Sequence, residues 1–324
     1  MHNIEDIQDI INKNIENLNF KLTPVELYEP ISYIFSFGGK RIRPVLTLLA
    51  CDLFDGQVED ALNPAIALEM FHNFTLIHDD IMDKAPMRRG KKTVYKKWNT
   101  DIAILSGDAL FAKAYEVAIK TNEKYLKNVL KVLTKAAIDV CEGQQYDMNY
   151  ETDKNITLPD YIEMIRLKTA ALIGACLKTG AIIGNADDNE VAKMYNFGEN
   201  LGLAFQLKDD LLDLFGKEEV FGKKTGGDVI TNKKTYLYVK SFELATGNEK
   251  KILSNYFSGN EFDEEEKIKT VKSIYNNLNV IEITENEIDK FFKQSIKCLD
   301  EINLPSFRKS ELKKLANQLL RRES

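Results

Sequence analysis

Apolar residues recur at every third or fourth position along most of this chain, and this spacing restricts its secondary structure more than any other feature. Segments such as ALNPAIALEMFHNFTLIHDDIMD and VAKMYNFGENLGLAFQLKDDLLDLFG keep the period over several turns, as one face of an α-helix requires. Alternating apolar and polar runs bounded by turn residues, which would indicate strands, are almost absent. The chain has 324 residues, 44% of them hydrophobic, and can bury a large core. We therefore predict an all-α protein, a single large helical bundle that forms one domain over residues 1–324.

Charge and composition exclude several classes of partner. Lys and Arg number 44 against 50 Asp and Glu, so the net charge of -6 provides no general attraction to nucleic acid or to an anionic membrane. The amino-terminal residues resemble an amphipathic helix rather than a secretion signal, and the longest apolar runs are too short or too interrupted to span a bilayer. The four cysteines lie far apart, which favours reduced thiols over disulfides or a zinc site. We expect a cytoplasmic protein with no nucleic-acid partner and no stable membrane insertion.

Two acidic clusters raise the question of what neutralises them. HDDIMD contains Asp79, Asp80 and Asp83, and KDDLLD repeats the pattern with Asp209 and Asp213. On a helix, the outer two aspartates of each cluster lie on one face at the end of an apolar run, where they repel each other and the helix dipole disfavours them. A solvated acidic face is the alternative for one copy, but two copies favour bound cations. Oxygen ligands without neighbouring His or Cys select magnesium rather than zinc.

Basic residues that could bind a phosphate group are concentrated in three glycine-containing segments. GGKRIRP, MRRG and GKKTGGDVITNKKT have the turn composition of loops, and the last lacks the spacing of a nucleotide-binding P-loop. Arginine guanidinium groups can fork onto phosphate oxygens. For the first segment alone, a solvated charge run is the alternative. The candidate side chains are Lys40, Arg41, Arg43, Arg88, Arg89, Lys223 and Lys233.

Four polar residues stand beside apolar runs near these clusters. His72 precedes Asp79 by two helical turns and shares its face, although a histidine in this position is more often part of the core. Gln206 lies three residues before the second aspartate cluster on the same helix face. Lys168 and Thr169 place an amine and a hydroxyl where a helix enters an apolar run. These side chains are candidates for contact with a substrate.

Seven motifs in this order resemble the all-trans polyprenyl (isoprenyl) diphosphate synthase family, in particular its short-chain geranylgeranyl and farnesyl diphosphate synthases. The motifs are GGKRIRP, EMFHNFTLIHDDIMDKAPMRRG, SGDALF, EGQQYDM, RLKTAAL, FQLKDDLLDLFG and GKKTGGDVITNKKT. The resemblance implies a helical fold around a deep central cavity, with the two aspartate motifs on facing helices, and usually a homodimer. It also implies a magnesium-dependent prenyltransferase. Such an enzyme condenses isopentenyl diphosphate with an allylic diphosphate by ionisation, condensation and elimination.

The resemblance assigns roles to the candidate residues. Asp79, Asp83 and Asp209 would bind magnesium, three ions per active site, with Asp80 and Asp213 assisting. The allylic diphosphate would be held by Arg88, Lys168, Lys223 and Lys233. Isopentenyl diphosphate would be held by Lys40, Arg43, His72 and Arg89, and Arg41 joins this set by its place in the motif. Thr169 and Gln206 would face the reacting carbons. No side chain stands out as the base that removes the final proton, and the released diphosphate is a candidate.

Product length is predicted from the residues that precede Asp79. Phe71, Phe74 and Thr75 lie within about two turns of it, where bulky side chains would form a floor that stops elongation. Aromatic core packing is the alternative interpretation. Within the family that the chain resembles, the short bacterial farnesyl type has two extra residues between the aspartates. This chain lacks them, which leaves C15 and C20 products both open, and we favour C20.

Two other functions remain open from the sequence. A terpene cyclase also ionises a prenyl diphosphate with magnesium, but it needs no second diphosphate site, so GGKRIRP and the second aspartate motif count against it. A non-catalytic subunit of a heteromeric synthase commonly loses aspartates, and both motifs are intact here. The sequence leaves the allylic starter and the downstream pathway undetermined.

Overall fold

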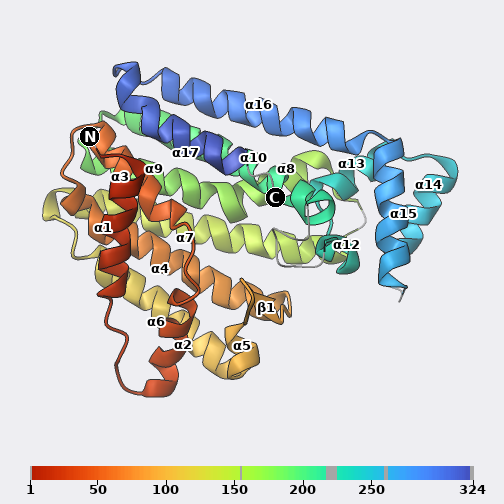
Figure 1. Cartoon of the computed structure of the whole chain (residues 1–324), viewed down its shortest axis with the longest axis horizontal. Helices are drawn as coiled ribbons and strands as arrows, with labels where there is room; N and C mark the ends of the chain where they lie inside the picture. Colours follow the sequence, from red (N-terminus) through yellow and green to blue (C-terminus); the bar gives the residue numbers. More distant parts are fainter. Residues whose placement is uncertain (1, 154, 217–224, 259–261, 322–324) are drawn as a thin grey trace. The chain divides into compact units, whose positions relative to one another are not determined.

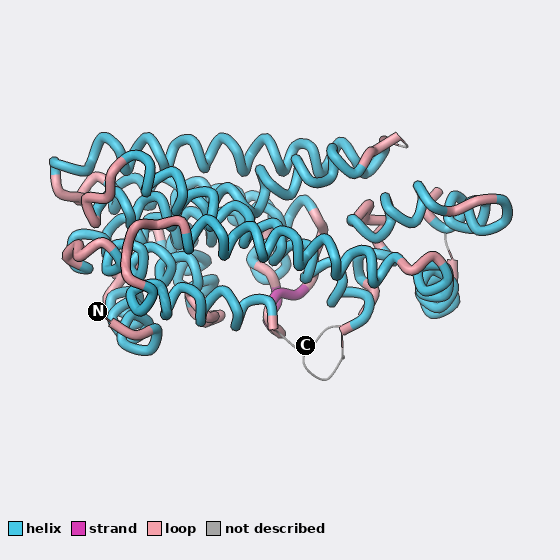
Figure 2. Tube along the Cα trace, turned by 90° about the horizontal axis from the view of Figure 1, so that it is seen from above, coloured by secondary structure: helices cyan, strands magenta, loops and turns pink. Residues whose placement is uncertain are grey.

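The computed structural model of the chain describes residues 2–153, 155–216, 225–258 and 262–321, and these residues are helical almost throughout (Figure 2). The all-α prediction is confirmed. Within the described ranges, the strands are limited to one antiparallel hairpin, β1 (Met87–Arg88) and β2 (Lys91–Lys92). None of the helices formed by the described residues combines the length and apolar composition that a membrane span needs.

The chain divides into two compact units, and four long helices contribute residues to both. Unit 1 contains Met1–Ala137, Ala175–Tyr195 and Asp300–Leu315, and unit 2 contains Ile138–Gly174, Asn196–Leu299 and Ala316–Ser324. The shared helices are α7 (Glu123–Thr152), α9 (Ala171–Ile183), α10 (Asp188–Phe215) and α16 (Val280–Asp300), and the shorter α17 (Ser310–Leu320) also belongs to both. The prediction of one domain over the whole chain stays a prediction.

In unit 1, α4 is the central helix because apolar residues cover most of its circumference. It packs against α3 and α6, and α4 and α6 run side by side in Figure 1. Met70 and Phe71 of α4 are at most 2% exposed. The helices that lie wholly in this unit are α1 (Ile4–Glu16), α2 (Val25–Phe35), α3 (Ile42–Leu53), α4 (Val58–Met82), α5 (Val94–Lys97), α6 (Thr100–Ala118) and the 3-10 turn η2 (Ser306–Lys309).

In unit 2, the apolar core forms where the carboxyl-terminal half of α10 meets shorter helices. Leu207 and Leu211 of α10 pack in one cluster with Tyr161 and Tyr275. The short α13 packs against α8 and α15, and α12 also contacts α15. The elements of this unit are α8 (Leu158–Ile165), η1 (Arg166–Ala170), α12 (Gly227–Ile230), α13 (Tyr236–Leu244), α14 (Gly247–Tyr256) and α15 (Glu264–Asn277).

Two glycines allow the backbone around η1 to be packed unusually closely. A Cβ atom on Gly143 of α7 would lie 2.3 Å from the backbone nitrogen of Lys168, and one on Gly202 of α10 would lie 2.6 Å from the Cα atom of Ala170. Real Cβ atoms do not approach other atoms this closely, so both positions require glycine. The segment that carries Lys168 and Thr169 is therefore held between two helix backbones.

Candidate active site

The first aspartate cluster lies at the carboxyl end of α4. Asp83 is the C-cap residue, and its backbone N–H donates to the carbonyl of Asp79 over 2.8 Å. Asp80 is 1% exposed, and its Oδ1 accepts from Nε and Nη2 of Arg88 at 2.9 and 2.8 Å. Arg88 lies on the β hairpin, where the sequence predicted an irregular loop. The buried Asp80 therefore fixes the guanidinium group of Arg88 at the carboxyl end of α4.

The glycines of GGKRIRP accommodate an arginine side chain. Gly38 and Gly39 have φ values of 65° and 130°, in the region that favours glycine. The guanidinium group of Arg89 donates to the carbonyl of Gly38, and a Cβ on Gly39 would lie 2.5 Å from its Nη1. Lys40 is exposed next to this contact. The turn therefore brings Lys40 and Arg89, two predicted diphosphate ligands, to the same place.

Arg41 has a structural role that the sequence did not predict. Its side chain is 7% exposed and donates to Glu69 Oε1 and to the carbonyl of Phe35, both over 2.9 Å. Its guanidinium carbon lies 5.5 Å from the centre of the Phe35 ring. Arg41 also has a left-handed backbone conformation at the N-cap of α3, with φ 46°. These contacts join α2, α3 and α4, and binding of a diphosphate by Arg41 stays a prediction.

His72 is surrounded by positive charge. Burial, followed by the charges of Arg43, Arg89, Arg88 and Arg41, lowers the pKa of its imidazole well below the ordinary 6.5. The ring is therefore neutral at pH 7 and retains one N–H that can donate. Burial also lowers the pKa of Arg89. A group of guanidinium side chains around a neutral histidine is a suitable environment for a polyanion.

The predicted chain-length floor belongs to an aromatic cluster formed by two helices. The ring centres of Phe71 and Phe74 lie 5.6 Å apart, and Phe111 of α6 lies 5.9 Å from the first and 5.1 Å from the second. Phe71 is fully buried, whereas Phe74 is partly exposed. Thr75 donates to the carbonyl of His72 over 2.8 Å. Sequence reasoning missed Phe111 because it lies on a different helix, far from the aspartate motif in sequence.

The second aspartate cluster lies on α10, and Asp213 contacts residues at the start of α12. Asp213 Oδ2 accepts from the backbone N–H of Asp228 over 2.9 Å. The backbone carbonyl of Asp213 accepts from the backbone N–H of Gly226 over 2.7 Å. Asp209 is partly buried, as is Asp213. Among the described residues, no three acidic, histidine or cysteine side chains lie together as a group that could hold a metal ion. Carboxylates that are partly accessible fit magnesium, which takes one or two of them together with substrate phosphates.

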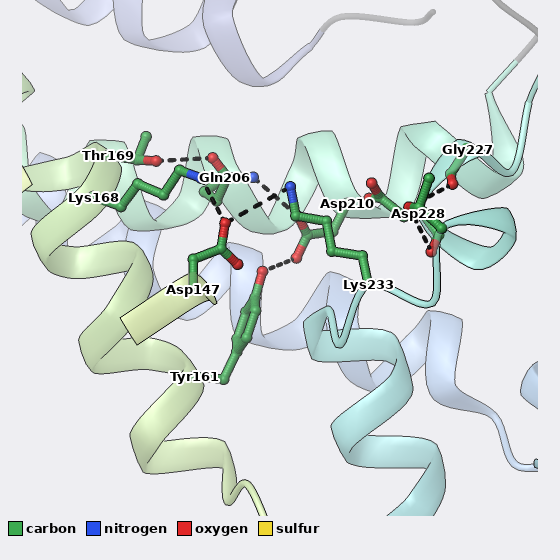
Figure 3. Close-up of polar contacts among 10 residues, drawn as sticks. Asp147, Tyr161, Lys168, Thr169, Gln206, Asp210, Gly227, Asp228 and Lys233 are labelled. Atoms are coloured by element: carbon green, nitrogen blue, oxygen red, sulfur yellow. Dashed lines mark hydrogen bonds and ion pairs between the residues drawn. The ribbon is translucent and has the colours of Figure 1, made fainter. Parts of the chain in front are cut away.

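A carboxylate that was not predicted connects two of the predicted lysines. Asp147 Oδ2 lies 2.5 Å from Nζ of Lys168 and 3.9 Å from Nζ of Lys233 (Figure 3). Burial alone would raise the pKa of Asp147, but Lys233 and Lys168 lower it below its ordinary value. Asp147 lies in the motif EGQQYDM, but the position of the motif in the sequence did not indicate that Asp147 contacts these lysines. Lys223 lies outside the described residues.

Thr169 and Gln206, which the sequence placed near the reacting carbons, are hydrogen bonded to each other. Thr169 Oγ1 donates to Gln206 Oε1 over 3.0 Å, and Gln206 Nε2 donates to Asp210 Oδ1 over 3.0 Å (Figure 3). The hydroxyl of Tyr161 donates to Asp210 Oδ2. Burial, and then the charge of Asp228, raises the pKa of Asp210 to about 7, and burial beside Asp210 raises that of Tyr161. Neither Tyr161 nor Asp210 was among the predicted site residues.

Lys168 and Thr169 lie on a π-helical turn, η1, between two α-helices. Such turns are rare and are found frequently at functional sites. The backbone of η1 contacts Gly143, so α7 limits where both side chains can lie. The sequence predicted a helix here, and hydrophobic spacing does not reveal an inserted residue in one turn.

The predicted residues are divided between the two units, and their binding roles stay predictions. Unit 1 contains Lys40, Arg41, Arg43, Phe71, His72, Phe74, Thr75, Asp79, Asp80, Asp83, Arg88 and Arg89. Unit 2 contains Lys168, Thr169, Gln206, Asp209, Asp213 and Lys233.

Comparison with known proteins gives a consistent result. Residues 24–276 match the family model described as polyprenyl synthetase. A geranylgeranyl diphosphate synthase of Sulfolobus acidocaldarius is 38% identical over 286 residues, which cover 87% of this chain and 86% of that protein. The crystal structure of a geranylgeranyl pyrophosphate synthase matches with a TM-score of 0.94 and 40% identity, covering 100% of both chains. A Caulobacter crescentus polyprenyl synthase, complexed with calcium and isoprenyl diphosphate, matches with a TM-score of 0.89 and 27% identity, over 99% of this chain and 96% of that one.

Proposed function

This chain belongs to the polyprenyl synthetase family and is a prenyltransferase, and from this premise we propose that it makes geranylgeranyl diphosphate, a C20 product. The proposed reaction condenses isopentenyl diphosphate with an allylic diphosphate. The observation that carries the proposal is the group of arginines around His72, because it offers a diphosphate site remote in sequence from Lys168 and Lys233. A terpene cyclase would not need a second diphosphate site.

The metal ions of the proposed reaction are magnesium, three per active site. Asp79, Asp83 and Asp209 would coordinate them, with Asp80 and Asp213 assisting. Support comes from the oxygen-only donor set and from the Caulobacter relative, which is complexed with calcium and isoprenyl diphosphate. Bound magnesium would supply positive charge to the diphosphate that leaves the allylic carbon.

The protein's own cations would share this task at the allylic diphosphate. Arg88, Lys168 and Lys233 would bind its oxygens, and the same role is proposed for Lys223, outside the described residues. When the allylic C–O bond breaks, the electron pair stays with the diphosphate, and fixed positive groups stabilise the charge that develops. Lys168 is held by an ion pair with Asp147, which fixes its position, so little rearrangement would be required.

The carbocation left behind would face a different environment. The side-chain oxygens of Thr169 and Gln206 would direct partial negative charge toward it. The double bond of isopentenyl diphosphate attacks the cation to form the new C–C bond. Loss of a proton, with the released diphosphate proposed as the base, regenerates an allylic diphosphate one isoprene unit longer.

Isopentenyl diphosphate would bind to Lys40, Arg43, His72 and Arg89. The neutral imidazole of His72 can donate a hydrogen bond without adding to the charge repulsion among the arginines. For Arg41 we propose a supporting role, because its guanidinium group is engaged by Glu69 and by the carbonyl of Phe35.

Product length would be set by Phe71, Phe74 and Thr75. The contacts of Phe111 with both rings support a wall formed by α4 and α6. Replacing Phe71 and Phe74 together by alanine should give products longer than C20 by chromatography. An unchanged distribution of products would contradict the proposed floor.

We also propose that the active form is a homodimer. Ile104 and Leu105 of α6 are 41% and 59% exposed, and Ile119, which follows this helix, is 55% exposed. Large apolar side chains exposed along one helix favour a protein interface there.

The test is direct turnover by the purified chain. It would be incubated with magnesium, isopentenyl diphosphate and a C5, C10 or C15 allylic diphosphate in turn, and the chain length of the product would be measured. A C20 diphosphate is expected. Cyclised hydrocarbon formed without isopentenyl diphosphate would instead identify a cyclase, and no turnover by the isolated chain would indicate a non-catalytic subunit.

A further inference from the structure

We propose that Tyr161 and Asp210 are positioning residues that fix the side-chain amide of Gln206, so that its oxygen rather than its nitrogen is directed to Thr169 and the reacting carbons. This inference rests on the proposed function. It assigns a task to two buried side chains that the proposed mechanism does not otherwise use.

The hydrogen bonds that link Tyr161, Asp210, Gln206 and Thr169 fix which atom donates and which accepts at each step. The hydroxyl of Tyr161 donates to Asp210 Oδ2, and Gln206 Nε2 donates to Asp210 Oδ1 over 3.0 Å (Figure 3). Both carboxylate oxygens therefore accept. Because Nε2 of Gln206 is committed to Asp210, its Oε1 must be on the opposite side, where it accepts from Thr169 over 3.0 Å. Without Asp210, nothing in this chain of bonds would prevent the amide from rotating by half a turn.

Burial makes this arrangement rigid. Tyr161 is 3% exposed and Asp210 is 5% exposed, so water cannot readily replace either partner. The tyrosine ring packs in the core of unit 2, with its centre 6.4 Å from that of Tyr236. Its backbone N–H donates to the carbonyl of Thr157, whose side chain caps the start of α8. Tyr161 is thus a fixed point against which the carboxylate can be oriented.

The orientation of the amide determines the sign of its interaction with a carbocation. The carbonyl oxygen of Gln206 carries partial negative charge and stabilises a nearby cation, whereas its N–H groups carry partial positive charge and repel one. Preorganised dipoles of this kind contribute strongly in a site from which water is excluded. A rotated amide would therefore oppose the ionisation step while leaving the diphosphate sites intact.

Asp210 belongs to the second aspartate motif, so the test must distinguish the proposed positioning role from a metal-binding role. Asp210→Leu removes both acceptors. Asp210→Asn keeps an acceptor oxygen for Gln206, because its amide nitrogen can be directed to the Tyr161 hydroxyl, which can accept as well as donate. A positioning role requires an acceptor, whereas a metal ligand requires the negative charge. The two variants therefore give different results under the two hypotheses.

The experiment measures kcat, the KM values of both diphosphates and the magnesium dependence of wild type, Asp210→Asn, Asp210→Leu and Tyr161→Phe. For Asp210→Leu we expect kcat to fall by about a hundredfold, with both KM values and the magnesium half-saturation within about twofold. Asp210→Asn should stay within about tenfold of wild type, and Tyr161→Phe should also lose kcat selectively. Tyr275→Phe is the control, because it removes another buried tyrosine hydroxyl of unit 2, and its kcat should be unchanged. Equal losses in Asp210→Asn and Asp210→Leu, with a raised magnesium requirement, would overturn the proposal.

A second measurement does not depend on catalysis. In a double-mutant cycle of thermal unfolding, Asp210→Leu and Gln206→Leu should lower Tm by less together than the sum of their separate effects, because each breaks the same hydrogen bond. Strict additivity would overturn the positioning role even if the enzyme is active. Loss of the proposed function would be recognised separately, as the failure of wild type to form a prenyl diphosphate.

Discussion

Replacing Gly143 by alanine should slow catalysis although no predicted site residue is changed. A Cβ atom at this position would lie 2.3 Å from the backbone nitrogen of Lys168, 2.7 Å from its Cα atom and 2.9 Å from the carbonyl carbon of Leu167. All three are backbone atoms, so no side chain can rotate away. The shortest distance must increase to at least 3.0 Å, and η1 must move away from α7.

The expected magnitude follows from two opposing effects. In an ordinary helix, alanine in place of glycine stabilises by about 1 kcal/mol through helix propensity. Overpacking of a rigid contact costs about 1–3 kcal/mol, so the free energy of unfolding should fall by up to about 2 kcal/mol. A displacement of reacting groups by about 1 Å can reduce the rate by about a hundredfold. Because the same turn carries Lys168 and Thr169, we expect kcat to fall by about tenfold to a hundredfold.

The assay combines urea unfolding with steady-state turnover at saturating concentrations of both diphosphates. Glu142→Ala is the matched control, because Glu142 is the exposed neighbour of Gly143 on α7 and its replacement should change neither quantity appreciably. If Gly143→Ala instead stabilises the protein by about 1 kcal/mol and keeps wild-type kcat, the reasoning about the contact with η1 is wrong.

Three further predictions concern residues of unit 1. Glu69→Ala leaves the buried guanidinium group of Arg41 without its carboxylate and should cost about 3–5 kcal/mol in urea unfolding; a loss below about 1 kcal/mol would show that the pair is not desolvated. Folding lowers the pKa of His72 below its ordinary value of 6.5. The contribution of His72 to the free energy of unfolding is therefore complete above pH 6.5. It is lost as the pH falls below that value, by up to about 1.4 kcal/mol per pH unit. His72→Gln should therefore lose less stability than wild type between pH 7 and 5.5, and parallel curves would contradict the lowered pKa. If α6 forms the interface of the proposed homodimer, Leu105→Asp should convert dimer to monomer in analytical ultracentrifugation, whereas an unchanged mass would contradict an interface at this helix.

The sequence was sufficient for the helical architecture because one period dominates it. Apolar spacing and the caps of helices are local properties, and the prediction that the first aspartates end a helix is confirmed at Asp83, the C-cap of α4. The hairpin at Met87–Arg88 was missed because Pro86 and Gly90 indicate a turn without indicating what pairs across it. Local periodicity also cannot reveal a single inserted residue, so η1 was predicted as an ordinary helix.

The sequence indicated which residues belong to the candidate site but not which of them contact one another. Charged and polar residues could be selected from their motifs, but Asp147, the partner of Lys168, and Thr169, a partner of Gln206, lie on other helical segments, and tertiary packing alone brings them together. Asp210 lies four residues after Gln206 on α10, where the helical repeat places the two side chains on one face. Arg41 shows the opposite case, because its motif suggested a ligand contact while its side chain is engaged by Glu69. Local sequence indicates which chemical groups are available, and the fold determines which of them meet.

The carboxylate of Asp147 has a consequence for which molecules unit 2 can retain. Asp147 Oδ2 lies 2.5 Å from Nζ of Lys168 and 3.9 Å from Nζ of Lys233, so both ammonium groups have an anionic neighbour. A small monoanion that displaced this carboxylate would replace it by a group of equal charge. If the two lysines bind a diphosphate as proposed, the higher charge of that ligand would favour the exchange, and Asp147 would contribute to selectivity for diphosphate over small anions.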